Sequence, residues 1–231
     1  MPKKNRIVLL RHGASVWNEM QIHQGQCFRE LGLSEKGYRQ AEITGRFFKD
    51  SPVICIWSSP LPRAMQTASI IRTCLPHKTP VFLNDDLMEI SNGVVDGMPF
   101  SEIKKLFPDG WSRWEKKIFD KPLFPRGEIV ENVLKRIVRA HEGIVNEAYE
   151  YANYNFLDEA TIIVVSHGAV NSLFLAHIDQ SPLEKAFEKF PQDNACINVL
   201  VWDSETKTFS IEKTNNTTHL GQFFFSPKIK I

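Results

Sequence analysis

The sequence Arg6-Ile-Val-Leu-Leu-Arg-His-Gly13 is a short apolar run that ends in an Arg-His-Gly tripeptide. Residues 161–168, Thr-Ile-Ile-Val-Val-Ser-His-Gly, repeat this pattern much later in the chain. Continuous apolar runs of this length are typical of strands that are buried on both faces of a parallel sheet. Because ligands bind beyond the carboxyl ends of such strands, we expect His12 and His167 to meet at one edge of the sheet.

Length, composition and charge limit the kind of protein this chain can be. The chain has 231 residues, 42% of them hydrophobic, and a formal net charge of +1. It is long enough to bury a sizeable core, and its near-neutral charge does not favour nucleic acid or an anionic membrane as a partner. No apolar stretch approaches the ~18 residues that span a bilayer, and the N-terminus does not resemble a signal peptide.

The cysteines indicate a reducing compartment. They are scattered and contain no Cys-x-x-Cys pair, which favours reduced thiols over a disulfide framework or a zinc site. They lie at Cys27, Cys55, Cys74 and Cys196. We therefore expect a cytoplasmic protein without a nucleic-acid or membrane partner, and the sequence leaves its oligomeric state open.

The order of the predicted elements indicates the fold class. Strands that alternate with helices are typical of an α/β fold with a mostly parallel sheet, here a three-layer α/β/α sandwich. Periodicity and turn residues predict strands at 6–10, 53–57, 81–83 and 161–165, helices at 36–49, 60–73 and 127–152, a helix after residue 167, and a terminal hairpin at 195–201 and 207–212.

Local signals refine this outline. Ser59 followed by Pro60 predicts a helix start, and the residues that begin at Ser181 resemble a capping box. Residues 92–126 are broken by glycine and proline, so we expect a small helical cap inserted into a single domain of residues 1–231. The aromatic residues of this insertion are expected to form its own small core, and they are Phe107, Trp111 and Trp114.

Charged side chains gather where the predicted strands end. Arg11 and His12 follow the first strand, Arg63 begins the helix after the second, Glu89 follows the third, and His167 follows the fourth. Guanidinium groups bind phosphate oxygens in bidentate geometry and stay charged at neutral pH. This set therefore predicts a binding site for a phosphate dianion.

The same residues suggest a mechanism. A histidine surrounded by arginines is kept neutral, so His12 is a candidate nucleophile that attacks phosphorus and forms a phosphohistidine. Arg11, Arg63 and His167 supply positive charge and hydrogen bonds to the transferred group. Glu89 is the best-placed group to protonate the leaving oxygen and later to deprotonate water. No metal or other cofactor is needed.

Four motifs, in order, resemble the histidine phosphatase superfamily in its phosphoglycerate mutase-like branch. The motifs are Leu10-Arg-His-Gly13, Ser58-Ser-Pro-Leu-Pro-Arg63, Leu87-Met-Glu-Ile90 and Val165-Ser-His-Gly168. Four motifs in order are a specific signal, whereas a lone Arg-His-Gly is not. The resemblance implies that His12 is phosphorylated, that Arg11, Arg63 and His167 hold the phosphate, and that Glu89 is the acid and base.

The resemblance also implies residues that bind substrate, namely Asn18, Gln24, Gly25 and Gly168. Asn18 has the alternative of a helix-start residue, and Glu30 and Asp96 compete with Glu89 for the role of the acid. Three loop positions depart from the common pattern of the family, at Ala14, Val95-Asp96-Gly97 and Gly127-Glu128-Ile129. These departures affect the loops that shape the substrate pocket.

The sequence therefore predicts a metal-independent phosphatase that acts on a small phosphorylated metabolite. A phosphoglycerate mutase is the first alternative, and the short insertion without a second anion pocket argues against it. A phosphoprotein phosphatase and a non-catalytic phosphate-binding module are further alternatives.

Overall fold

A six-stranded sheet lies in the middle of the computed structural model, which describes residues 4–27, 32–76, 78–154, 159–203 and 205–221. The strand order is β3-β2-β4-β1-β5-β6. The strands are β1 Lys4–Arg11, β2 Val53–Ser58, β3 Val81–Leu83, β4 Glu159–Ser166, β5 Ile197–Asp203 and β6 Thr208–Asn216. The first four are parallel and the last two form an antiparallel hairpin, so the mostly parallel sheet is confirmed.

The central strand β1 is buried on both faces, as its unbroken apolar run predicts. Ile7 and Leu9 pack into one hydrophobic cluster, and Val8 and Leu10 pack into another on the opposite face. None of these four side chains is more than 2% exposed. Each contributes about 1.5–3 kcal/mol by burial, which fixes this strand at the centre of the sheet.

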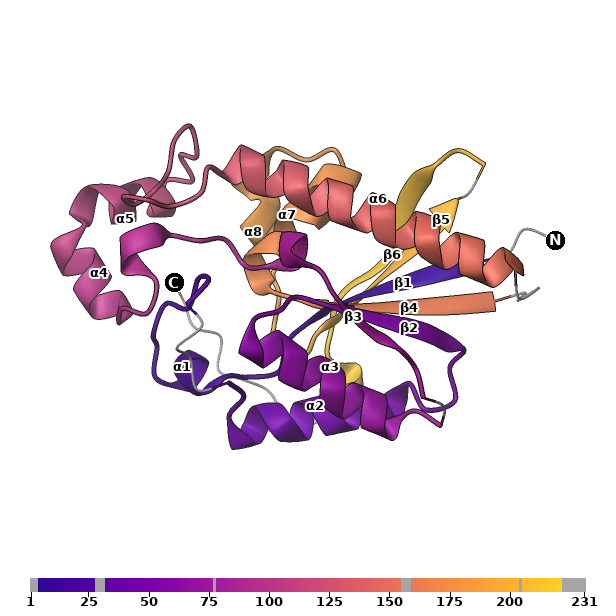
Figure 1. Ribbon diagram of the computed structural model, residues 1–231. Helices are drawn as coiled ribbons and strands as arrows, with labels where there is room; N and C mark the ends of the chain where they lie inside the picture. Colours follow the sequence, from indigo (N-terminus) through magenta and orange to yellow (C-terminus); the bar gives the residue numbers. More distant parts are fainter. Residues whose placement is uncertain (1–3, 28–31, 77, 155–158, 204, 222–231) are drawn as a thin grey trace.

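Helices cover both faces of the sheet (Figure 1). Figure 1 shows α2 and α3 on one face and α6 and α7 on the other, which confirms the three-layer α/β/α arrangement. The α-helices are α1 Val16–Glu19, α2 Glu35–Phe47, α3 Pro62–Cys74, α4 Phe100–Leu106, α5 Pro108–Glu115, α6 Val130–Tyr154, α7 Gly168–Ile178 and α8 Ala186–Lys189. The 3-10 helices are η1 Asp85–Leu87, η2 Gly93–Val95, η3 Leu183–Lys185 and η4 Thr218–Leu220.

The predicted start of α3 is wrong. Leu61 is the N-cap and Pro62 is the first helical residue, because the residue before a proline avoids the helical conformation, and Leu61 is extended with a ψ of 136°. Ser59 lies in the loop before the helix, where its amide donates to the carbonyl of Val165 at 3.0 Å. Ser59 is therefore held against the end of β4, and its hydroxyl is directed to the site described below.

The predicted capping box at Ser181 is also wrong. The Ser181 hydroxyl donates to Asp179 and accepts a hydrogen bond from Lys189 Nζ at 3.0 Å. Because this side chain is already paired, the next turn begins at Pro182 without a side-chain cap and is the 3-10 helix η3. The long helix α6 begins at Val130, later than the predicted residue 127.

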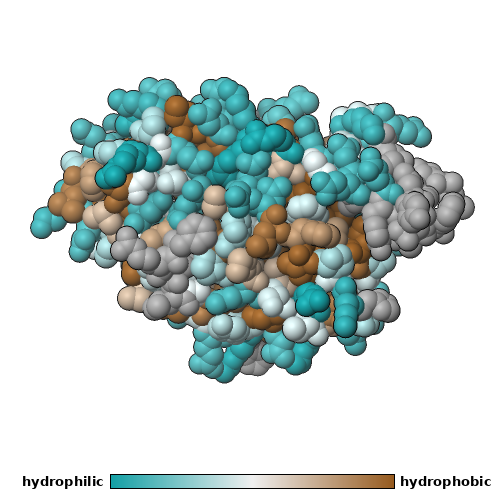
Figure 2. Space-filling view, viewed as in Figure 1, coloured by the Kyte–Doolittle hydropathy of each residue, from teal (hydrophilic) through white to brown (hydrophobic). Residues whose placement is uncertain are grey.

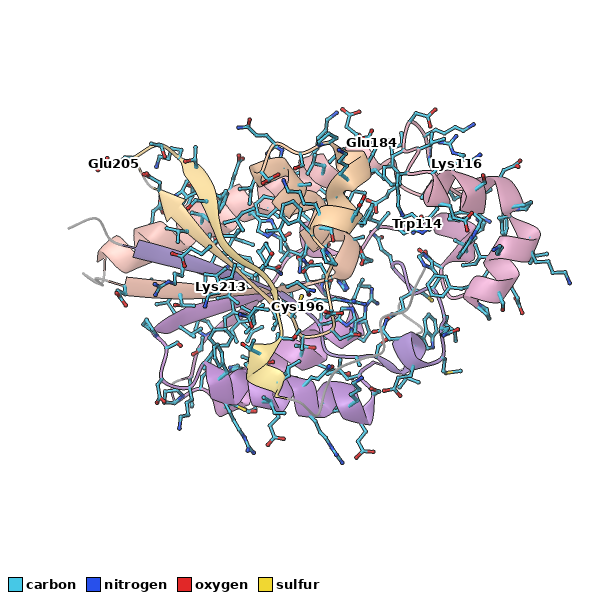
Figure 3. All side chains as sticks on the ribbon, turned by 180° about the vertical axis from the view of Figure 1, so that it is seen from behind. Trp114, Lys116, Glu184, Cys196, Glu205 and Lys213 are labelled. Carbon is cyan, nitrogen blue, oxygen red and sulfur yellow. The ribbon has the colours of Figure 1, made fainter. Side chains whose placement is uncertain are left out.

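Residues 92–126, the cap segment, contain η2, α4 and α5 and lie beyond the carboxyl ends of the parallel strands (Figure 1). Phe107 and Trp111 pack against a small core of their own, as predicted. Trp114 does not join that core, because its ring packs on Phe187 of α8 with a centroid distance of 5.2 Å. Trp114 thus joins the cap segment to the body of the protein, and it lies on the side of the cap segment that faces the body in Figure 3.

The surface is mainly hydrophilic, with apolar atoms scattered over the face shown in Figure 2. The exposed large apolar side chains include Phe82 and Leu83 of the edge strand β3 and Phe100 and Leu106 of α4. Among the described residues, no helix is both long enough and apolar enough to cross a membrane.

Candidate active site

The two predicted histidines meet at the carboxyl ends of neighbouring strands. Arg11 of β1 is in register with Ser166 of β4, and the next amide, that of His12, donates to the Ser166 carbonyl at 3.0 Å. The rings of His12 and His167 consequently lie 5.2 Å apart, centroid to centroid. Both side chains are buried, at 2% and 0% exposure.

Arg63 enters the same site from the first turn of α3. Its side chain is 1% exposed, and its Nε donates to His12 Nε2 at 3.2 Å. Its Nη2 donates to the carbonyl of Gly25 at 2.9 Å. Arg63 thus connects the nucleophile candidate to the loop that contains Gly25.

The hydrogen bonds of His12 define which ring nitrogen carries the lone pair. The distance from His12 Nδ1 to the Gly13 carbonyl is 2.7 Å, and a carbonyl oxygen only accepts, so Nδ1 carries the proton. Burial and the charges of Arg63 and Arg11 hold the pKa of His12 well below its ordinary value of 6.5. The ring is therefore neutral at pH 7, with its lone pair on Nε2.

His167 has a similar electrostatic environment. Burial, followed by the charge of Arg63, holds the pKa of His167 well below 6.5. Its Nε2 lies 2.8 Å from the Ser59 hydroxyl, while its buried Nδ1 has no hydrogen-bond partner within the described parts of the chain. Sequence reasoning gave Ser59 the role of a helix cap and so missed this contact.

Arg11 completes the group of Arg11, His12, Arg63 and His167, which we call the His–Arg cluster. Arg11 Nη1 donates to the carbonyl of Gln192 at 2.5 Å, and its buried Nε has no partner among the residues that the structure describes. A Cβ at Gly168 would lie 3.4 Å from Arg11 Nε, so glycine leaves the guanidinium room at the start of α7. The carbonyl of Cys196 accepts from the Arg11 amide. Cys196 is labelled in Figure 3, which shows the molecule from behind, and so locates the end of β1 in that view.

Glu89 lies beside the cluster, where its carboxylate contacts the first turn of α7. Its Oε2 accepts from the Ala169 amide at 3.2 Å, and its Oε1 accepts from the Ile90 amide at 2.9 Å. The negative charge of Glu89 acts on Arg11 and raises the pKa of that guanidinium, although burial lowers it more strongly. The structure thus brings the fifth predicted residue to the same edge of the sheet.

Asp96, one of the competing carboxylates, is held in a loop. It accepts hydrogen bonds from the amides of Asn92 and Gln26 at 3.0 and 3.2 Å and from the Ser91 hydroxyl at 3.0 Å. Burial raises the pKa of Asp96 above its ordinary value of 3.8. Burial also lowers the pKa of His23, whose Nε2 lies 3.6 Å from Asp96 Oδ1, to about 4, so that imidazole is neutral at pH 7. The other competitor, Glu30, is outside the described residues.

Ser15 binds two of the predicted substrate-binding residues, Asn18 and Gln24. Asn18 Oδ1 accepts from the Ser15 amide at 3.0 Å in a capping box at the start of α1. Asn18 is therefore a helix-start residue, which is the alternative prediction for it. Gln24 Oε1 accepts from the Ser15 hydroxyl at 2.8 Å. Gly25 has a φ of +48°, and a Cβ there would lie 1.8 Å from Asp96 Oδ1, so only glycine fits.

Thr67 is a further residue of the site that sequence reasoning did not assign. Its hydroxyl accepts from the Gly13 amide at 3.1 Å and donates to the Arg63 carbonyl at 2.7 Å. The available signal was its place one turn after Arg63 on the helix. Within the described ranges, no group of three or more His, Cys, Asp or Glu side chains is arranged to hold a metal ion.

Comparison with known proteins identifies the family. Residues 7–217 match the profile of the histidine phosphatase superfamily (branch 1). The chain is 30% identical to the "Uncharacterized phosphatase PhoE" of Bacillus subtilis, over 94% of this chain and 97% of that protein. It is also 30% identical to "Phosphoserine phosphatase 1" of Hydrogenobacter thermophilus, over 95% of this chain and 96% of that one.

The solved structures agree on the fold. The structure of YhfR from Bacillus stearothermophilus superimposes with a TM-score of 0.82 at 24% identity, covering 94% of this chain and 99% of that one. The family expected from the four motifs is therefore confirmed, and the chain belongs to the histidine phosphatase superfamily.

Proposed function

We propose that this enzyme hydrolyses small phosphomonoesters through a phosphohistidine on His12, without a metal ion. The observation that carries the proposal is the state of the His12 ring. Its Nδ1–H is bound to the Gly13 carbonyl, and its Nε2 lone pair lies beside the guanidinium of Arg63. A neutral imidazole held in this way is a nucleophile placed where an anionic phosphoryl group binds.

In the first step, His12 Nε2 attacks phosphorus and the bond from phosphorus to the ester oxygen breaks. Arg11, Arg63 and His167 stabilise the charge on the equatorial oxygens, and the leaving alkoxide takes a proton from the carboxyl group of Glu89. The buried Arg11 Nε and His167 Nδ1, for which the described residues offer no partner, support this assignment because a phosphate oxygen would satisfy them.

In the second step, the Glu89 carboxylate accepts a proton from water as the water oxygen attacks phosphorus. The bond from phosphorus to nitrogen breaks, and neutral His12 and inorganic phosphate are released. Asn18, Gln24, Gly25 and Gly168 are proposed to contact the phosphate or the substrate around this centre.

The substrate class is proposed from the relatives. The phosphoserine phosphatase of Hydrogenobacter thermophilus makes phosphoserine the first candidate, and phosphoglycerate follows from the resemblance of the motifs. A cytoplasmic location is part of the proposal, and the four free thiols support it because thiols stay reduced there. We also propose that the cap segment is an insertion within one domain.

The test is an incubation with excess 3-phosphoglycerate in which free phosphate and 2-phosphoglycerate are measured together, with and without 2,3-bisphosphoglycerate. A parallel incubation uses phosphoserine, and His12→Ala is the control. The proposal expects phosphate release from at least one substrate and no isomer. Primer-dependent 2-phosphoglycerate with little phosphate would establish a mutase, and no product from any alkyl phosphate would favour a binding module.

A further inference from the structure

Arg136, on the second turn of α6, uses every N–H group of its guanidinium. Its Nε and Nη2 donate to the two carboxylate oxygens of Glu128, each at 3.0 Å. Its Nη1 donates to the carbonyls of Asp86 and Met88, each at 2.7 Å, and Nη2 also donates to the carbonyl of Glu89 at 3.1 Å. A guanidinium has five N–H donors, and these contacts account for five.

The acceptors of Arg136 belong to the segment that leads to the Glu89 carboxylate. The remaining carbonyl of this segment, that of Leu87, accepts from the Ser166 hydroxyl at 2.8 Å. All four carbonyls of residues 86–89 are thus bound by side chains from α6 and β4. The path of this short connection is set by side-chain donors, because it belongs to no strand and contains only the 3-10 helix η1.

A second side chain, that of Gln26, binds the same acceptors. Gln26 Nε2 donates to the Glu89 carbonyl at 2.8 Å and to Glu128 Oε2 at 3.1 Å. Gln26 follows Gly25, whose carbonyl accepts from Arg63. The group of Gln26, Glu128 and Arg136, the Arg136 network, therefore connects the Glu89 backbone to the loop that Arg63 binds.

Burial makes this network costly to leave incomplete. The side chain of Arg136 is 12% exposed and that of Glu128 is 28% exposed, so each charge needs the other. Lysine would supply a point charge with three donors in place of the planar five-donor fork, and it could not reach all of these acceptors at once. The geometry requires an arginine here.

We propose that Arg136 is a positioning residue for Glu89, with Glu128 and Gln26 completing the constraint. Arg136 touches no reacting atom. It fixes the main chain of residues 86–89, so that the Glu89 carboxylate stays against the Ala169 amide and beside the His–Arg cluster. This inference rests on the proposed function, in which Glu89 protonates the leaving oxygen.

A misplaced Glu89 and a loss of folded protein would affect the rates with different leaving groups differently. An alkoxide needs a proton in order to leave, whereas 4-nitrophenolate is a weak base and leaves without one. Misplacing Glu89 should therefore slow transfer from an alkyl phosphate and spare transfer from 4-nitrophenyl phosphate. Loss of folded protein would slow both equally.

The experiment measures the single-turnover rate of phosphoenzyme formation by rapid quench for the wild type and Arg136→Lys. The substrates are 4-nitrophenyl phosphate and the fastest alkyl substrate among phosphoserine, 3-phosphoglycerate and glycerol 3-phosphate. We expect a loss of about 10–100-fold with the alkyl phosphate, part of the 10²–10⁴-fold effect of a lost general acid. With 4-nitrophenyl phosphate we expect less than about a threefold change, because that step needs no acid.

Lys135→Gln is the matched control, because Lys135 lies next to Arg136 on the same helix and pairs with Glu131 at the surface. It should leave both rates unchanged. Gln26→Leu is a second test variant, because it removes one donor to the Glu89 carbonyl without changing α6. It should show the same dependence on the leaving group if Arg136→Lys does not fold.

A double-mutant cycle completes the test. In a Glu89→Gln background, Arg136→Lys should have no further effect on the alkyl phosphate, because the acid it positions is already absent. Equal losses with both leaving groups, or additive losses in the cycle, would overturn the inference. If the wild type forms no phosphoenzyme with any of these substrates, the proposed function itself fails.

Discussion

The His–Arg cluster and the cap segment differ in how their side chains are held. His12, Arg63 and His167 are at most 2% exposed. His12 and His167 directly follow β1 and β4, and Arg63 lies in α3, elements that the core fixes in place. The cap segment has a small core of its own, and large apolar side chains such as Phe100, at 40%, stay exposed.

On the proposed function, the two regions have different tasks: the His–Arg cluster carries out the reaction, and the cap segment selects the substrate. The reaction depends on groups whose positions follow from the sheet, so the same chemistry needs the same residues. On the same proposal, the cap segment contributes to the choice of substrate, because it lies outside the sheet and its side chains can change without disturbing the core. We therefore expect changes in the His–Arg cluster to remove turnover and changes in the cap segment to alter affinity.

The largest effect is expected for His12→Ala. Because His12 Nε2 is the proposed attacking atom, turnover should fall below detection while the protein stays folded. The measurement is phosphate release together with thermal unfolding. His177→Ala, which changes an exposed histidine on α7, is the control and should keep full activity. Substantial residual turnover in folded His12→Ala would contradict the assignment of the nucleophile.

The next largest effect is expected for Glu89→Gln. An amide keeps the shape of the side chain but cannot donate or accept the proton, so kcat for an alkyl phosphate should fall by about 10²–10⁴-fold. Asp96→Asn tests the competing carboxylate, whose oxygens are occupied by loop donors. If Asp96→Asn lost that factor and Glu89→Gln did not, the acid would be Asp96.

A smaller effect is expected in the cap segment. The Phe100 ring packs on His23 and Trp111, with centroid distances of 5.6 and 6.3 Å. Phe100→Ala should raise KM several-fold and change kcat by less than about threefold, because binding contacts are lost without affecting the chemical step. Steady-state kinetics give the answer. A fall in kcat as large as the rise in KM would contradict the division of tasks between the cap segment and the His–Arg cluster.

The smallest effect concerns stability and a histidine outside both regions. His141 is buried, stacks on Phe174, and has its pKa lowered by burial to about 4. Below pH 6.5 the unfolded chain binds a proton at this position that the folded protein does not, so the free energy of unfolding falls as the pH falls from 6.5 towards 4. His141→Phe should reduce the stability loss between pH 7.5 and 5.5 by about 1 kcal/mol in urea unfolding.

Other buried histidines are expected to account for much of the change in stability with pH that remains in His141→Phe. The pKa values of His12 and His167 are also lowered, and they shift stability in the same direction. A wild type that is equally stable at both pH values would contradict the neutral state assigned to these rings.

The sequence predicts most of the fold because the central strands carry a strong signal. Residues 6–10 and 161–165 are unbroken apolar runs, and burial on both faces is the state that such runs favour. The helix α1 could not be predicted, because its four residues give no periodicity and its stability depends on the capping box of Ser15 and Asn18. The helix start at Ser59 failed because Leu61 precedes a proline and is held in an extended conformation, and the one at Ser181 failed because Asp179 and Lys189 bind its hydroxyl.

The site is predictable only in part for a related reason. Residues that directly follow strand ends, such as His12 and His167, can be placed from topology alone, whereas Glu89 comes after the 3-10 helix η1 and competed with two other carboxylates. Arg136 cannot be placed in this way, because in the sequence it resembles Arg139 on the same helix. Only the folded structure shows that Arg136 binds three main-chain carbonyls of residues 86–89 while Arg139 binds the side chain of Asp86.

The most direct test of the account is to identify the phosphorylated residue. Enzyme mixed with a ³²P-labelled alkyl phosphate is quenched within one turnover, digested, and mapped by mass spectrometry under alkaline conditions, in which phosphohistidine survives. The account predicts acid-labile, base-stable phosphate on His12, and none on the His12→Ala enzyme. Phosphate on another residue, or turnover without any covalent phosphoenzyme, would contradict it.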